Sequence, residues 1–285
     1  MRDKPLFGTA GSPEDFYNSG YKTSLQMPEY LQKIGLDAFE YQCGRGVNVS
    51  KQTAQNLRDK SLEHSIALSV HSPYYINIAS PDPIRQKSSF GHIVKTLEFA
   101  KNLGANRIVI HMGSVGEQER DVAMWVSRQM VKMLMHEVDE LGFSNIHLCF
   151  ETMGKINQLG TLEEVIEVCK IDERILPAID FGHLNARTHG GIKTKEDYEK
   201  IINDIRQELG DYRAKNFHAH FSKIEWTEGG EKRHLTFSDT QFGPDFKPLA
   251  KVIAEQNLTP TIICESKGTQ GIDALQMKKM YQDEI

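Results

Sequence analysis

The sequence has few cysteines, no long apolar run and no large excess of charge. Its four cysteines are far apart and include no Cys-x-x-Cys pair, so we expect buried free thiols rather than a disulfide framework. No stretch approaches the ~18 to 20 apolar residues of a membrane span, and the first residues do not resemble a signal peptide, so we expect a cytoplasmic protein. The net charge of −5 argues against nonspecific coating of nucleic acid. It does not exclude DNA as a partner, because the charge of a bound metal ion is not counted.

Short apolar runs alternate with longer amphipathic segments along the 285 residues. This alternation is typical of βα units around a parallel sheet. The expected strands are residues 6–10, 38–42, 67–72, 107–113, 146–152, 176–183, 216–222 and 260–266. Apolar residues at helical spacing predict helices over 83–103 and 121–141, which Gly104 and Gly142 are expected to end.

Eight expected strands in a chain of this length favour a closed barrel over an open doubly wound sheet, which is the structural alternative. The segment after the first strand lacks the G-x-G-x-x-G spacing of dinucleotide-binding folds. We therefore predict an α/β protein with a single (β/α)8 TIM-barrel domain over residues 1–285.

Polar residues that can bind metal lie at the ends of the third to eighth expected strands. They are His71, His111, Glu151, Asp180, His218 and Glu265, and His183 follows Asp180 by three residues. The carboxyl ends of all strands in a barrel open onto one face, which holds the active site. These scattered residues therefore predict one metal site, with donors that suit zinc and also manganese or iron.

Each of these residues also has a structural interpretation. A single histidine near a strand end is often structural, and Glu151 or Glu265 could cap the following helix. Burial of either glutamate after an apolar strand is costly without a positive partner, and neither strand contains a lysine or arginine. One shared cation explains all of the positions together. His64, His92, His136, His147 and His189 are expected at surface, packing or solvated positions. His220 points to the same side as His218 and could contact substrate or support a ligand.

In this set of motifs the sequence resembles the endonuclease IV family of apurinic/apyrimidinic endonucleases, and more loosely the xylose-isomerase-like TIM barrels. The resemblance covers nearly the whole chain. It is carried by His71-Ser72-Pro73-Tyr74-Tyr75-Ile76-Asn77, His111-Met112-Gly113, Glu151-Thr152, Asp180-Phe181-Gly182-His183, His218 with Ser222-Lys223, and Glu265. Each motif alone is weak, but together they are specific because they occur in order and in register.

The resemblance implies three zinc sites. The first would use His71, His111 and Glu151. The second would use Glu151 as a bridge together with Asp180, His218 and Glu265. The third would use His183 and His234, but Lys232 stands where the family has an aspartate, so Glu231 would have to substitute for it. The implied cofactor is two or three Zn²⁺ ions, or Mn²⁺ or Fe²⁺ in their place.

The resemblance also implies a reaction and a partner. It implies metal-assisted hydrolysis of duplex DNA on the 5′ side of an abasic site, as a step of base excision repair. Glu151 would anchor the ions, Glu265 would orient the nucleophile, and Tyr74, Tyr75 and Arg45 would contact the DNA. We expect the protein to act as a monomer. The chain departs from the family around Arg45, for which an ion pair within a loop is the alternative.

Two other functions compete with this interpretation. A single-metal sugar isomerase or epimerase of the xylose-isomerase-like group would need only Glu151, Asp180, His218 and Glu265, which leaves three histidines without a role. A metal-binding barrel without catalysis is the third hypothesis. The surplus of ligands favours the nuclease.

Overall fold

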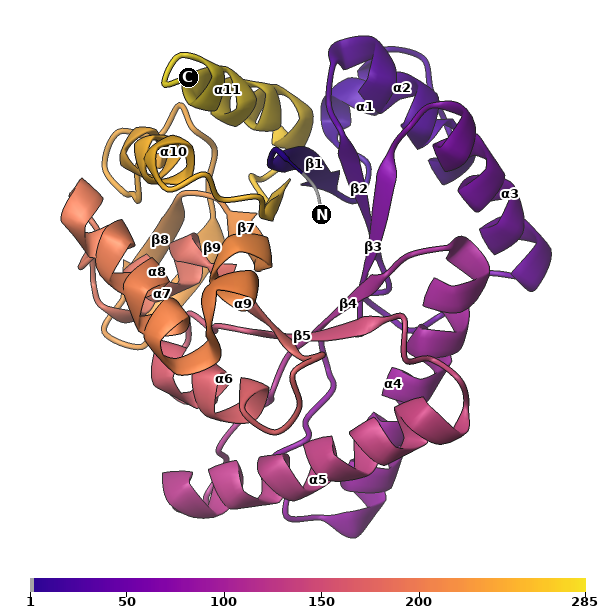
Figure 1. The fold of residues 1–285 in the computed structure, drawn as a ribbon, viewed down its shortest axis with the longest axis vertical. Helices are drawn as coiled ribbons and strands as arrows, with labels where there is room; N and C mark the ends of the chain where they lie inside the picture. The colour runs from indigo at the N-terminus through magenta and orange to yellow at the C-terminus, as the bar shows by residue number, and fades with distance from the viewer. Residues whose placement is uncertain (1–2) are drawn as a thin grey trace.

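The fold is a closed barrel of parallel strands in the order β1-β10-β7-β6-β5-β4-β3-β2, described for residues 3–285 by a computed structural model. Figure 1 shows the strands at the centre with the helices around them. The barrel strands are β1 (Leu6–Ala10), β2 (Ala38–Gln42), β3 (Ala67–His71), β4 (Arg107–Ile110), β5 (His147–Glu151), β6 (Leu176–Asp180), β7 (His218–Phe221) and β10 (Thr261–Cys264). The predicted TIM barrel is confirmed.

The helices connect the strands and cover the outside of the barrel. They are α1 (Glu14–Asn18), α2 (Met27–Ile34), α3 (Lys51–Glu63), α4 (Pro83–Leu103), α5 (Arg120–Glu140), α6 (Leu162–Cys169), α7 (Phe181–Arg187), α8 (Lys195–Leu209), α9 (Asp211–Asn216), α10 (Phe246–Glu255) and α11 (Gln270–Gln282), with a short 3-10 turn η1 (Ser24–Gln26). Helix α4 begins where the Asp82 side chain accepts a hydrogen bond from the Ile84 amide, and it ends at Gly104, whose φ of 74° favours glycine. Its predicted bounds are confirmed.

Two predicted strands are shorter in the structure because helices take part of their length. Residues 181–183 belong to helix α7, since the Asp180 side chain accepts a hydrogen bond from the His183 amide and caps that helix. Residue 216 belongs to helix α9, so the strand predicted over 216–222 begins only at His218. His218 is therefore the first residue of β7 and does not lie at its carboxyl end. Both differences lie beside the mouth of the barrel and affect how the site is built.

A short antiparallel hairpin, which the sequence did not predict, lies between β7 and α10. Its strands are β8 (Ile224–Thr227) and β9 (Gly230–His234). The hairpin docks on the loop that follows β5, where the Glu231 amide donates to the Gly154 carbonyl at 3.0 Å. A side chain at position 154 would overlap Glu231, so glycine is needed for this approach.

The main apolar core fills the layer between strands and helices, and only small apolar clusters lie within the barrel itself. The four cysteines are free and buried, as expected. Among residues 3–285, none of the helices combines the length and hydropathy that a membrane crossing requires.

Candidate metal centre

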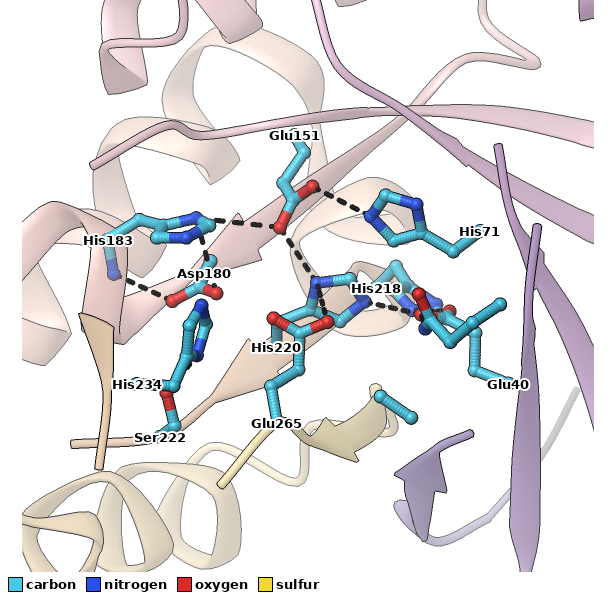
Figure 2. Close-up of polar contacts among 12 residues, drawn as sticks. Glu40, His71, Glu151, Asp180, His183, His218, His220, Ser222, His234 and Glu265 are labelled. Carbon is cyan, nitrogen blue, oxygen red and sulfur yellow. Dashed lines mark hydrogen bonds and ion pairs between the residues drawn. The ribbon is translucent and has the colours of Figure 1, made fainter. Parts of the chain in front are cut away.

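Glu151, the last residue of β5, lies at the centre of the polar groups at the mouth of the barrel (Figure 2). Its Oε2 atom is 3.3 Å from Nε2 of His71 and 2.9 Å from Nε2 of His111. The three side chains come from the ends of neighbouring strands and could hold one ion between them. The structure therefore brings together the ligand set expected for the first site.

The second group lies on the other side of Glu151. Its members are Glu151, Asp180, His220 and Glu265, whose potential ligand atoms are all within 4.8 Å of one another. The Nδ1 atom of His220 is 2.8 Å from Oε1 of Glu151 and 3.6 Å from Oε1 of Glu265. Since one oxygen of Glu151 faces each group, this carboxylate can bridge two ions.

The sequence placed His218 in this second group, and the structure corrects that assignment to His220. Both imidazoles point into the barrel because they are two residues apart on one strand. In the sheet register, however, His220 is opposite Asp180, whereas His218 is opposite Ala178. His218 therefore lies one layer deeper, with its Nε2 atom 2.9 Å from Glu40, and its ring nitrogens do not converge with the second group.

The third group consists of His183, Glu231 and His234. Oε2 of Glu231 is 3.4 Å from Nε2 of His183, and Oε1 is 3.8 Å from Nε2 of His234. Glu231 thus occupies the place that the sequence assigned to it only as a substitute. Lys232 points away and pairs with Glu225, their charged atoms 2.6 Å apart.

A β-bulge explains how Glu231 reaches this group. Trp226 is opposite Glu231 and Glu225 is opposite Arg233, so no residue of β8 lies opposite Lys232 in the register. Residues three apart on a regular strand face opposite sides, but one extra residue returns them to the same side. The bulge therefore turns Glu231 and His234 toward His183 together.

Three imidazoles, those of His71, His183 and His234, have Nδ1 held by a neighbouring oxygen and Nε2 directed toward a carboxylate of the site. Nδ1 of His71 lies 2.8 Å from the Ser72 carbonyl, and Nδ1 of His183 lies 2.9 Å from the Thr152 carbonyl. Nδ1 of His234 is 2.8 Å from the Ser222 hydroxyl. Partners of this kind fix the tautomer and the orientation of a metal ligand, which leaves Nε2 free to coordinate.

The electrostatics of the mouth favour positive charge. Burial raises the pKa of Asp180, and the charges of Glu265 and Glu151 add to this effect, while His183 opposes it. Burial alone would lower the pKa of His71, but hydrogen bonding and charge from Glu151 raise it to about 9. His183 behaves similarly: Asp180 and Glu231 outweigh burial and raise its pKa to about 9. A cation at the mouth would neutralise the same carboxylates.

Divalent ions fit the donors that these groups offer. Oδ2 of Asp180 is buried and makes no hydrogen bond to a described residue, although Nδ1 of His183 is 3.3 Å away. A cation or water would satisfy this oxygen. Imidazole nitrogens and carboxylate oxygens are ligands for zinc, manganese and iron. The same donors do not distinguish between these metals.

A cavity of about 260 Å³ opens at the mouth. Every member of the first and third groups lines it, as do Glu265, Tyr74 and Lys155, whereas Asp180 and His220 of the second group are fully buried and do not. Tyr74 and Tyr75 are 59% and 46% exposed, and their rings pack edge-on against each other, with Tyr75 also against His92. Gly44 lies against the Tyr74 ring, which brings the exposed Arg45 beside the two tyrosines. The three residues predicted to contact DNA therefore occupy one side of the mouth.

The fold and the site define a TIM barrel with groups of potential metal ligands at its carboxyl mouth. The chain belongs to the family of xylose isomerase-like TIM barrels, which it matches over residues 28–285.

Relatives within this family differ in their names. A protein of Methanocaldococcus jannaschii named uncharacterized protein MJ0133 is 30% identical over 278 residues, which cover 98% of this chain and 97% of the relative. A probable endonuclease 4 of Mycoplasma genitalium is 30% identical over 236 residues, covering 80% of this chain and 75% of the relative.

Solved structures with the same fold include an epimerase-like protein and an endonuclease, the two classes of enzyme that the sequence left open. A D-tagatose 3-epimerase-like protein superposes with a TM-score of 0.72 at 18% identity, covering 98% of this chain and 97% of that one. Endonuclease IV from Thermus thermophilus superposes with a TM-score of 0.71 at 16% identity, covering 99% of this chain and 100% of that one. At these identities the likeness concerns the fold alone.

Proposed function

We propose that this protein is a metal-dependent phosphodiesterase that cleaves duplex DNA on the 5′ side of abasic sites. The observation that carries the proposal is the set of three adjoining ligand groups, two of which share Glu151. A reaction that needs one ion would use only the second group. The similarity to a probable endonuclease 4 over 80% of the chain supports the same proposal.

Divalent ions held by these groups would act as Lewis acids that lower the pKa of water and stabilise charge on the phosphate oxygens. Glu151 would hold the first two groups at a fixed separation, because each of its oxygens faces one of them. Glu265 is partly exposed at the edge of the cavity, where it could orient the attacking water. Lys155, which lines the same cavity, would pair with the phosphate backbone.

The aromatic rim would select the substrate. An abasic nucleotide has no stacked base to displace, so turning it out of the duplex costs less than for a normal nucleotide. Tyr74 lines the cavity and Tyr75 packs beside it, and both rings are exposed, so they could stack on the bases that flank the gap. Arg45 lies on the same side and could contact a phosphate.

A sugar epimerase is the second candidate, and one observation favours it. The group of Glu151, Asp180, His220 and Glu265 provides four ligands, enough for one catalytic ion without the other two groups. In that case His71, His111, His183 and His234 would have no catalytic role.

Incubation with a duplex that carries a single abasic-site analogue tests the proposal. The protein is stripped with a chelator, reloaded with Zn²⁺ or Mn²⁺, and mixed with the end-labelled duplex. We expect one nick on the 5′ side of the analogue, a product that a polymerase can extend, and no cleavage of the same duplex with a normal base. The measurement is a denaturing gel with and without polymerase.

The rival function is tested in parallel with D-tagatose in heavy water, where epimerisation would exchange a proton for deuterium. Exchange without nicking would replace the nuclease by the epimerase. Intact duplex after reloading with either metal would contradict the proposal whatever the sugar assay shows.

Replacement of Tyr74 by alanine should weaken substrate binding without changing the metal content. Loss of one aromatic–base stack costs about 1–3 kcal/mol, so we expect KM for the abasic duplex to rise by roughly 5- to 150-fold. The matched control is Tyr212→Ala, because Tyr212 is similarly exposed but lines a cavity at the opposite, amino end of the barrel. Equal KM values for the two variants would show that Tyr74 does not contact the substrate.

A further inference from the structure

Glu40 is a charged residue in the interior of the barrel for which the proposed reaction has no role. It lies in β2, one layer below the mouth, and is fully buried. A buried carboxylate is costly unless it is paired and hydrogen-bonded. Its contacts therefore indicate what it stabilises.

The Glu40 carboxylate is surrounded by four polar atoms. Oε1 accepts a hydrogen bond from Nε2 of Gln42 at 3.1 Å, and Oε2 accepts one from the Ser69 hydroxyl at 2.9 Å. In addition, Nε2 of His220 is 2.9 Å from Oε1, and Nε2 of His218 is 2.9 Å from Oε2. Each oxygen thus has one neutral donor and one imidazole beside it.

Nε2 of His218 and Nε2 of His220 are close to the Glu40 carboxylate but are not aligned for a directed hydrogen bond. Two arrangements could explain these contacts. Glu40, His218 and His220 could hold an ion of their own, since their potential ligand atoms converge. However, such an ion would have three protein ligands, and all three residues are sealed from solvent, so water has no route to complete a four-coordinate shell. The alternative is that Glu40 acts on the imidazole of His220.

His220 connects the inner layer to the mouth. Its Nε2 atom faces Glu40, while its Nδ1 atom faces Glu265 and donates a hydrogen bond to Oε1 of Glu151 at 2.8 Å, as Figure 2 shows. An ion at the mouth would take the place of this Nδ1 proton, and His220 could then keep a proton only on the side of Glu40. Nδ1 of His71, His183 and His234 lies beside a neutral carbonyl or hydroxyl oxygen, although that of His183 is also 3.3 Å from Oδ2 of Asp180. His220 differs from these three because the carboxylate on its far side, Glu40, belongs to none of the three groups at the mouth. A carboxylate behind a ligating histidine fixes its tautomer and makes it a stronger ligand.

We infer that Glu40 is a positioning residue for metal binding at the mouth, which holds the proton of His220 on Nε2 and keeps Nδ1 available to an ion. His218 supports this arrangement by contacting the other oxygen of Glu40. The inference rests on the metal binding in the function proposed above, although not on the nuclease activity.

Zinc titration of the Glu40→Gln variant, in competition with a chromophoric chelator, tests the inference. Glutamine keeps the size of the side chain but removes its charge. We expect one class of site to bind zinc 10- to 100-fold more weakly than in the wild type, while the remaining zinc binds as before. Ser69→Ala is the matched control, because it removes one hydrogen bond from Glu40 and leaves the carboxylate facing His220; its zinc affinities should be nearly unchanged.

A second measurement uses the wild type, so that it holds even if Glu40→Gln fails to fold. Long-range 15N–1H correlation spectra of the zinc-loaded protein report which nitrogen of His220 carries the proton, and we expect Nε2. Protonated Nδ1, or equal zinc affinity of Glu40→Gln and wild type, would overturn the inference. Loss of one whole zinc equivalent from both Glu40→Gln and His218→Gln would also overturn it, because that result requires an inner ion.

The outcomes separate this inference from the nuclease proposal. A wild type that binds zinc but does not nick abasic DNA contradicts the nuclease alone. A wild type that binds no zinc contradicts both.

Discussion

Replacement of Glu151 by glutamine is expected to lower the rate of nicking at an abasic site by about a thousandfold or more. The carboxylate places one oxygen in each of two ligand groups, and the amide nitrogen of glutamine cannot act as a ligand. Metal ions stabilise the charge of the transition state by several kcal/mol, and each 1.36 kcal/mol is tenfold in rate. Both groups should also retain less zinc during dialysis against a weak chelator, which metal analysis measures.

Thermal unfolding should show whether Glu151→Gln has lost only a metal ligand or also its fold. Without metal, Glu151→Gln takes a negative partner from His71, His111 and His220, so its melting temperature should fall below that of the stripped wild type, while a cooperative transition would show that the fold is kept. With zinc, the wild type should gain more stability than the variant, because only ions that bind the folded state stabilise it. The control is Glu63→Gln, since Glu63 is exposed on helix α3 and contacts no ligand group. Wild-type activity in Glu151→Gln would exclude the two-ion arrangement.

The barrel could be predicted from the sequence because each strand is a short apolar run that a longer amphipathic segment follows. The structure confirms the eight strands and the bounds of helix α4. The strand ends were less predictable. Residues 181–183 continue the apolar pattern of β6, yet the Asp180 side chain caps a helix there, and a local hydrogen bond decides between the two conformations.

The candidate site was predictable where strand ends alone determine position. His71, Glu151 and Asp180 are each the last residue of a strand, and His111 and Glu265 directly follow one. His218 was misplaced because two histidines at a spacing of two share the same side of a strand, and only the register with β6 shows which one lies level with Asp180. The role of Glu40 could not be predicted, because its partners Ser69, His218 and His220 are far away in the sequence.

The third ligand group shows a different limit of sequence patterns. A spacing of two puts an aspartate and a histidine on the same face of a regular strand, and here that spacing leads from His234 to Lys232. The bulge in β9 moves the same function to Glu231. Bulges depend on pairing with a second strand, so the sequence of one strand does not reveal them.

Substitutions at two neighbouring positions test which residue completes the third group. The bulge predicts Glu231, whereas a spacing of two from His234 predicts residue 232. Loss of a residue that only supports a metal ligand weakens metal binding by roughly 10- to 100-fold, so Glu231→Gln, which changes a ligand itself, should weaken binding of the third ion at least as much. Nicking should also fall at zinc concentrations that saturate the wild type. Lys232→Gln should change neither quantity, because the Lys232 side chain is exposed on the other face and pairs with Glu225. Zinc titration and single-turnover nicking, performed on both variants, measure the difference. If Lys232→Gln lost the third ion while Glu231→Gln kept it, the hairpin would pair without the bulge in solution, and His183 and His234 would need another carboxylate.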